Sequence, residues 1–308
     1  MSRPSVFSFA RYLSAKRTVD DRALNHHVAS TFRRELAAVD HLTCLELGGG
    51  IGTMVERLWE NEYLPAAAYH LVDANPDNIA VAAARLAHLA PDAATSSGPQ
   101  PGPVIHLRAA PRPDLDVHLH HADVFDFMDA HRDLTAFDVV IAHAFLDLVS
   151  VEPTLTRLVA GLHPGALVYF TINFDGATIL QPGIDPAFDD LVEQVYHRTM
   201  DERLVDGQPS GDSHTGRHLY HAMQKTGIQV LDAGSSDWVV IPHSGSYPHD
   251  EAYFLHYIVH TLANALADHP LLDRQHFADW IATRHEQIER GELVYIAHQI
   301  DYLGRVHK

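Results

Sequence analysis

Cysteine is almost absent from this chain of 308 residues, and long apolar runs are missing altogether. Because Cys44 is the only cysteine, no disulfide can form within the chain, and its place in an apolar run indicates a small buried side chain. No apolar stretch is long enough to cross a bilayer, and the basic residues near the N-terminus flank only short apolar pieces, unlike a secretory signal. We therefore expect a cytoplasmic protein without a membrane partner.

Basic residues are also few. Lys and Arg number 22 against 40 Asp and Glu, which gives a formal net charge of −18 with histidine neutral. Because such a chain repels phosphates, the charge argues against a nucleic-acid partner. The length and the 46% hydrophobic content allow one large core with a sizeable cap, and they leave open a monomer or a homodimer.

Three common site motifs are missing as well. The chain has no G-x-x-x-x-G-K-[ST] loop for a triphosphate, and no H-E-x-x-H helix for zinc despite 25 histidines. Neighbours such as His26 and His27 point to opposite sides of an element, which does not suit one ion, so no required metal is expected. The G-x-G-x-x-G motif of dinucleotide-binding proteins is also absent, since Thr53 and Val55 stand where its third glycine would be.

What the chain does have is a glycine-bent turn directly after an apolar run. Between Leu45 and Met54, Glu46 and the glycines at 48, 50 and 52 have E-x-G-x-G-x-G spacing. Glycines there allow a sharp turn and a close approach of a ligand to the backbone, and Thr53 onward is typical of a helix start that closes the site. The pattern predicts a nucleotide-sized ligand at the end of a first strand.

A second apolar run, Tyr69 to Asp73, ends in an acid and is followed by a turn that begins at Ala74. A carboxylate at the end of the second strand is placed to accept the hydroxyl protons of a ribose, which we expect of Asp73. Pro76 suits the first turn of a helix and Asn75 its N-cap, so simple capping chemistry is the alternative for this acid.

The first pattern resembles the opening motif of class I S-adenosylmethionine-dependent methyltransferases, which implies S-adenosyl-L-methionine as the cofactor. Val117 to Phe125 resembles the third motif of that family, which implies that Asp123 bonds the adenine amino group and that Val124 packs on the ring. Phe137 to Asp147 resembles the fourth strand, with His143 at its mouth. The residues expected to bind the methyl donor are Glu46, Gly48, Gly49, Gly50, Gly52, Met54, Asp73, Ala74, Asp123, Val124 and His143.

The resemblance covers residues 42 to 172 and implies an α/β fold of the Rossmann-like kind. Its sheet would have seven mostly parallel strands with helices on both faces, and the last strand, around Leu293 to Ile300, would run antiparallel between its neighbours. Residues 1–37 are expected to form a helical lid on this methyltransferase domain, which spans 38–308. In that lid, Asp20 or Asp21 would open the amphipathic stretch from Ala23 to Leu36.

Insertions are expected at three places in the domain. Six prolines between Pro91 and Pro113 indicate an exposed loop before the third strand. Helical cap insertions are expected at about 173–213, where Asp185 to Met200 is a helical stretch, and at about 243–291. Both caps follow strands, where open α/β sheets place their substrate contacts.

Aromatic side chains in the lid and cap suit a small organic methyl acceptor, although they could equally attach the cap helices to the sheet. Ser213 to Arg217 lies at a helix start, where backbone donors and a guanidinium could hold an acceptor carboxylate or phosphate; a helix cap beside a surface arginine is the alternative. The residues expected to bind the acceptor are Tyr12, Phe174, Arg217, Trp238 and Tyr253.

The expected reaction is direct in-line displacement, in which the acceptor attacks the donor methyl and the protein supplies orientation and exclusion of water. If the acceptor carries a proton, His143 is the expected general base, and Asp147 would orient it or bind the acceptor. Contact of His143 with the donor, or packing, is the alternative. Two other functions stay open: a non-catalytic S-adenosylmethionine-binding regulatory protein and, on a weaker motif, a nucleotide-cofactor oxidoreductase.

Overall fold

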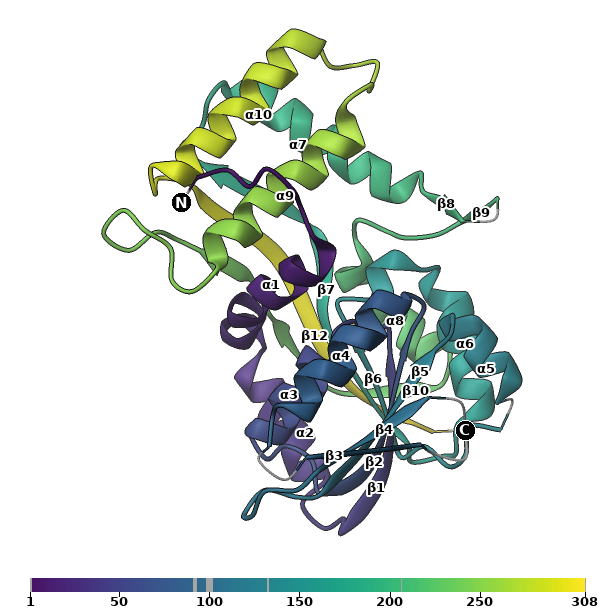
Figure 1. Ribbon diagram of the computed structural model, residues 1–308. Helices are drawn as coiled ribbons and strands as arrows, with labels where there is room; N and C mark the ends of the chain where they lie inside the picture. The colour runs from purple at the N-terminus through teal and green to yellow at the C-terminus, as the bar shows by residue number, and fades with distance from the viewer. Residues whose placement is uncertain (1, 91–92, 98–101, 132, 206, 308) are drawn as a thin grey trace.

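The computed structural model describes residues 2–90, 93–97, 102–131, 133–205 and 207–307. Figure 1 shows one twisted sheet flanked by helices, with further helices forming a cap at one end. None of the helices in these ranges combines the length and the apolar character that crossing a bilayer requires.

The central sheet contains ten strands within the described residues, in the order β10-β12-β7-β6-β1-β2-β5-β4-β3, with β11 paired to β12. Strands β5, β2, β1, β6 and β7 run parallel to one another, whereas β12 is antiparallel to both β7 and β10. The strands of this sheet are β1 (His41–Leu47), β2 (Ala66–Asp73), β3 (Ala94–Ser97), β4 (Pro103–Leu107), β5 (Leu115–His121), β6 (Val139–His143), β7 (Leu167–Gln181), β10 (Ile228–Ser235), β11 (Trp238–Val240) and β12 (Val294–Val306).

This topology confirms the expected α/β fold, with a mostly parallel sheet and an antiparallel last strand between its neighbours. The expected count of seven strands is wrong, because β3, β4 and β11 are added to it. The proline-rich stretch between Pro91 and Pro113 is not simply a loop: Ala94–Ser97 pairs antiparallel with Pro103–Leu107 and extends the edge at β5. Within that stretch, residues 91, 92 and 98–101 lie outside the described residues.

Helices cover both faces of the sheet, as expected. Side chains of α2, α3 and α4 pack with Cys44 in one buried apolar cluster, and those of α5, α6 and α8 pack with Leu45 in another. Because consecutive residues of a strand point to opposite faces, neighbours in β1 serve the two layers. The helices are α1 (Phe9–Ala23), α2 (His26–Glu35), α3 (Thr53–Glu60), α4 (Pro76–Ala87), α5 (Val124–Ala130), α6 (Val151–Gly161), α7 (Pro186–Asp201), α8 (Thr215–Lys225), α9 (Glu251–Leu266) and α10 (Arg274–Glu289), with the 3-10 turn η1 (Leu146–Leu148).

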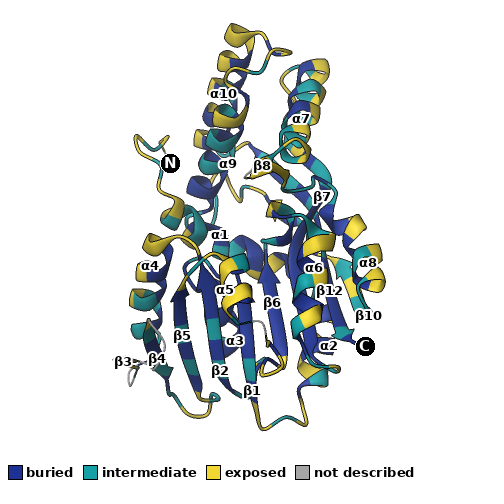
Figure 2. Cartoon of the chain, turned by 90° about the vertical axis from the view of Figure 1, so that its right-hand side faces the viewer, coloured by how far each residue is buried: buried dark blue, intermediate teal, exposed yellow. Residues whose placement is uncertain are grey.

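The cap lies beyond the carboxyl ends of the parallel strands. Figure 2 shows α7, α9 and α10 there, and a third buried cluster joins them to α1, β7, β11 and β12. Strands β7 and β12 carry the sheet into the cap, since they remain paired as far as Gln181 opposite Val294. Asp185 caps α7 by accepting the backbone N–H groups of Ala187 and Phe188, so the helix expected between Asp185 and Met200 is present.

The N-terminal segment is helical, but its helices differ from the expected ones. Ser8 caps α1, which runs to Ala23, and Asn25 caps α2 by accepting from the N–H groups of His27 and Val28. The expectation that Asp20 or Asp21 opens a helix is therefore wrong. Asp20 lies inside α1 and is fully buried. Its carboxylate does not cap a helix but bonds to His143 and Trp238 in other elements.

Candidate functional site

The turn after β1 has the backbone geometry that its glycines permit. Gly48, Gly50 and Gly52 have φ of +66°, +55° and +78°, a region that L side chains rarely adopt, and α3 begins at the next residue. A Cβ at Gly48 would lie 2.3 Å from Cδ2 of Phe145, so the close approach also excludes a side chain there. At Gly49, a Cβ would lie 2.4 Å from Cγ of Leu71.

Asp73 ends β2 and faces this turn. Its Oδ2 accepts the backbone N–H of Gly50 at 2.8 Å, while Oδ1 accepts the N–H of Asn75 at 2.9 Å and Nδ2 of Asn78 at 3.1 Å. A carboxylate oxygen can accept more than one hydrogen bond, so Oδ2 keeps capacity for a ligand hydroxyl beside the glycine turn. The structure thus brings together the two predicted sites, and Ala74 follows as an exposed residue.

Glu46 lies in the strand that leads into the turn and is almost fully buried. Burial raises its pKa to about 8, even though the hydroxyl of Tyr69 donates to Oε2 at 2.9 Å and acts to lower it. The carboxyl group is therefore mostly protonated at neutral pH and can donate one hydrogen bond. Met54 is packed in the core instead, where its Sδ accepts from Nη1 of Arg57 at 3.3 Å.

Asp123 and Val124 open α5 after β5. Asp123 is exposed, and its Oδ1 accepts the N–H groups of Phe125 at 2.7 Å and Asp126 at 3.3 Å, which is a helix N-cap. Val124 is buried in the apolar cluster behind α5 and α6. Both residues follow the carboxyl end of a strand next to β2, as an adenine contact requires, but their observed bonds are those of a cap and a core.

His143 ends β6, and both of its ring nitrogens have protein partners. Nε2 lies 3.1 Å from Oδ2 of Asp20, and Nδ1 lies 2.8 Å from the hydroxyl oxygen of Thr171. Because Asp20 is acceptor-only as a carboxylate, Nε2 donates to it and Nδ1 accepts from Thr171. Burial lowers the pKa of His143 to about 4, with Asp20 acting against that shift. The expected open general base is therefore a neutral imidazole held between a helix and a strand.

Asp20 is a residue of this site that the sequence did not reveal. Its carboxylate also accepts Nε1 of Trp238 at 2.8 Å and Nζ of Lys16 at 2.9 Å, so it joins α1 to β6 and β11. Burial acts to raise the pKa of Asp20, but Lys16 and His143 together hold it well below its usual range. No local pattern relates Asp20 to His143, which is 123 residues away in the chain.

Asp147 lies in η1, shortly after β6 ends. Its Oδ1 is buried and has no hydrogen-bond partner in the part of the chain that the structure describes. Burial raises the pKa of Asp147, against the opposing effect of Arg203 and Lys16. Burial and the charge of Asp147 raise the pKa of Tyr196, which lies in α7, to about 12. A carboxyl group with one buried oxygen thus lies near a tyrosine of the cap.

The aromatic residues expected to bind the acceptor mostly meet in the cap. Tyr12 stacks on Tyr257 with ring centroids 4.3 Å apart and on Phe254 at 5.7 Å, and Trp238 contacts Phe254 edge-on at 5.4 Å. The hydroxyl of Tyr253 accepts the N–H of Ser8 at 2.6 Å, so Tyr253 anchors the start of α1. These contacts attach the lid to α9, in agreement with the alternative that the aromatics serve packing.

Phe174 belongs to the same buried cluster as Trp238 and Tyr253, whereas Arg217 is not part of it. Phe174 is buried in β7 and meets the ring of His197 edge-on at 5.3 Å. Arg217 lies in the first turn of α8, and its Nε donates to Oδ1 of Asp175 at 2.8 Å. The guanidinium of Arg217 thus already has a carboxylate partner.

No family model matches the chain, and a search of curated proteins finds no match. The fold is similar to an S-adenosylmethionine-dependent methyltransferase from Thiobacillus denitrificans in complex with S-adenosyl-L-homocysteine, with 16% identity, a TM-score of 0.48 and 100% of each chain covered.

Two further similar structures are more distant. One is geranyl diphosphate C-methyltransferase from Streptomyces coelicolor, with 11% identity, a TM-score of 0.44, and coverage of 90% of this chain and 78% of that one. The other is a cyclopropane synthase from Mycobacterium tuberculosis, with 9% identity, a TM-score of 0.42, and coverage of 98% and 100%. Likeness at this level concerns the fold and assigns no activity to this chain.

Proposed function

We propose that this chain is an S-adenosylmethionine-dependent methyltransferase that acts on a small organic acceptor. The observation that carries the proposal is the contact between Asp73 and the N–H of Gly50 at 2.8 Å, at the carboxyl ends of β1 and β2. This contact supports the proposal because a carboxylate suited to ribose hydroxyls then lies beside a glycine turn that leads into a helix N-terminus. The sheet topology, with β12 antiparallel between β7 and β10, agrees with the same class.

The residues at this edge fit an adenosyl ligand. The glycines at 48, 50 and 52 carry no side chains of their own, although Phe145 and Leu13 pack close to the turn. Asp73 has an oxygen with spare acceptor capacity. Glu46, protonated at neutral pH, would present a donor from the strand below the turn. Asp123 and Val124 follow the next strand in the sheet and would meet the adenine from that side.

When bound, the donor supplies a methyl group on a positively charged sulfur, and direct displacement by an acceptor needs no covalent intermediate with the protein. The work of the chain is then to orient the reactants and to keep water out. Tyr12, Trp238 and Phe254 close the lid over the strand ends, and aromatic ring faces favour a cation.

In this proposal the general base is Asp147 and not His143. His143 has both nitrogens engaged and a pKa near 4, so it positions α1 through Asp20 rather than accepting a proton from the acceptor. Asp147 has an unpartnered buried oxygen and a raised pKa, which suits a group that binds the acceptor and takes up its proton.

Calorimetric titration of the donor into Asp73 variants tests the proposal. Asp73→Asn removes a charged acceptor from the ribose, and loss of a hydrogen bond to a charged group, worth about 1.5–3 kcal/mol, weakens the affinity roughly 10- to 100-fold. Asp77→Asn is the matched control, since Asp77 is an exposed residue in the first turn of α4, the helix that follows Asp73. Equal donor affinities in both variants and the unaltered chain would contradict the proposed ribose contact.

Catalysis is tested separately from binding. With the donor bound, a panel of small amines, phenols and carboxylic acids is assayed for formation of S-adenosyl-L-homocysteine. Turnover of an acceptor that falls in Asp147→Asn supports the assignment. Tight donor binding without turnover of any acceptor would instead support a non-catalytic binding protein.

A further inference from the structure

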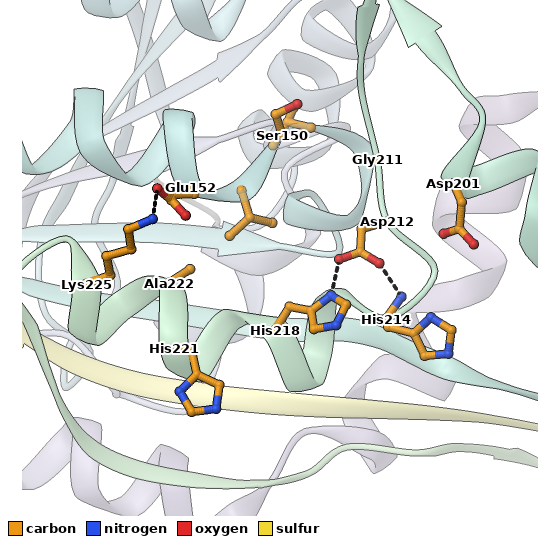
Figure 3. Close-up of a pocket in the computed structure, with 12 residues that line it drawn as sticks. Ser150, Glu152, Asp201, Gly211, Asp212, His214, His218, His221, Ala222 and Lys225 are labelled. Atoms are coloured by element: carbon orange, nitrogen blue, oxygen red, sulfur yellow. Dashed lines mark hydrogen bonds and ion pairs between the residues drawn. The ribbon is translucent and has the colours of Figure 1, made fainter.

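Three potential metal ligands gather where α7 ends and α8 begins. Asp201 ends α7, while Asp212 and His214 lie in the segment just before α8. One ligand atom from each residue lies within 4.8 Å of the others. Figure 3 shows these side chains grouped at one end of a pocket, with Lys225 and Glu152 at the other end.

The pocket beside the group has a volume of about 650 Å³ and opens to solvent. His218 and His221 of α8 also line it, together with Ser150 at the start of α6. An ion held by the three residues would therefore be reached from solvent, and it would have room for water or a further ligand on its open side.

The three side chains are held in place by the chain around them. The N–H of Ser213 donates to Oδ1 of Asp201 at 2.8 Å, and the N–H of His214 donates to Oδ1 of Asp212 at 2.7 Å. The hydroxyl of Ser213, a fully buried residue, lies 2.9 Å from Nδ1 of His214. Partners of this kind orient the imidazole and carboxylate ligands of metal sites.

The surroundings on α8 and β7 add to this support. Nδ1 of His218 lies 2.6 Å from Oδ2 of Asp212, so one histidine orients a carboxylate of the group. The ring of His214 lies directly over Gly176, where a Cβ would come within 2.6 Å of it. The backbone of β7 therefore leaves room for that imidazole.

The protein offsets the charges of the group only in part. Asp201 has no ion pair in the described ranges of the chain, and Asp212 pairs with His218 and interacts electrostatically with Arg217. Two carboxylates that approach each other repel, and a cation between them would remove that repulsion. The ligand set of two carboxylates and one imidazole suits a divalent first-row metal ion.

We propose that Asp201, Asp212 and His214 bind a divalent transition-metal ion, with Zn²⁺ or Mn²⁺ as the ion. The remaining coordination positions of the ion are filled by water or by an anionic group that enters the pocket between the ion and Lys225. This proposal departs from the sequence-based expectation that no metal is required, and it does not depend on the methyltransferase assignment.

Titration of Zn²⁺, and separately Mn²⁺, into the chelator-treated full chain tests the site. The result expected is one site whose affinity falls by about 100-fold or more in His214→Ala and in Asp212→Asn, since even indirect partners of a ligand change affinity 10- to 100-fold. His221→Ala is the matched control, because His221 lines the same pocket outside the group, and it should bind as the unaltered chain does.

A second measurement separates loss of the site from misfolding. Zn²⁺ or Mn²⁺ should raise the thermal midpoint of the unaltered chain and of His221→Ala, but not that of Asp201→Asn, whose exposed side chain carries no packing. Circular dichroism verifies that each variant is folded. Metal affinity in folded His214→Ala equal to that of the unaltered chain, or absence of saturable binding in the latter, overturns the proposal.

Discussion

Replacing Asp20 by alanine is expected to destabilise the protein strongly. The side chain of Asp20 is 0% exposed and that of its partner Lys16 is 7% exposed, so both charges are taken out of water. The same carboxylate accepts hydrogen bonds from Trp238 and His143 at 2.8 and 3.1 Å. The substitution leaves a buried ammonium and two N–H groups without their acceptor.

The magnitude follows from these contacts. Removing one partner of a buried ion pair costs about 3–5 kcal/mol, because the remaining charge stays buried without compensation. Asp20→Asn keeps an oxygen for Trp238 but loses the charge opposite Lys16, so it should lose most of the same stability. Adding Lys16→Met to Asp20→Ala removes the stranded charge and should recover part of the loss.

Urea unfolding at neutral pH, followed by tryptophan fluorescence and circular dichroism, measures the free energy of unfolding of each variant. Asp268→Ala is the control, since Asp268 and Arg274 form a pair at 81% and 80% exposure and such pairs contribute roughly 0.2–1 kcal/mol. A loss for Asp20→Ala no larger than that of Asp268→Ala would refute the view that this network holds the lid on the sheet.

Two other substitutions test the sheet and the glycine turn. His70 stacks on His118 and His120, and burial lowers its pKa to about 3. Below about pH 6.5, His70 therefore binds a proton in the unfolded chain but not in the folded chain. The free energy of unfolding consequently falls as the pH falls. His70→Phe should therefore lose less stability than the unaltered chain between neutral pH and about pH 5 in urea titrations, and an identical loss would contradict this. Gly48→Ala should lower the free energy of unfolding by roughly 1–2 kcal/mol because of the left-handed backbone, and further because of the clash with Phe145. Adding Phe145→Ala to Gly48→Ala should relieve only the clash. Unchanged urea midpoints would contradict this prediction.

The fold and the core of the candidate site could be predicted because their signals are local. The apolar runs that end at Glu46 and Asp73 each mark a strand, and parallel neighbours bring their carboxyl ends to one edge of the sheet. The contact between Asp73 and Gly50 follows from that adjacency. The composition of Pro91 to Pro113 predicts a loop and not the hairpin found there, because that hairpin depends on pairing with β5, which composition does not encode.

The contacts of His143 and the grouping of the proposed metal ligands are not encoded by any local pattern. The place of His143 at a strand end predicts a general base, but α1 brings Asp20 against it from 123 residues away. Asp201, Asp212 and His214 match no regular ligand spacing, and only the fold of the chain between α7 and α8 brings them together. Spacing rules recognise ligands on one helix or strand, not ligands assembled by a loop.

The most direct test of the central claim is calorimetric titration of S-adenosyl-L-homocysteine into the unaltered, folded chain. The account predicts saturable binding of one molecule per chain, and competition by S-adenosyl-L-methionine for the same site. NADH should give no heat of binding under the same conditions. Absence of saturable binding of S-adenosyl-L-homocysteine by a well-folded preparation would contradict the assignment of the glycine turn and Asp73 to an adenosyl ligand.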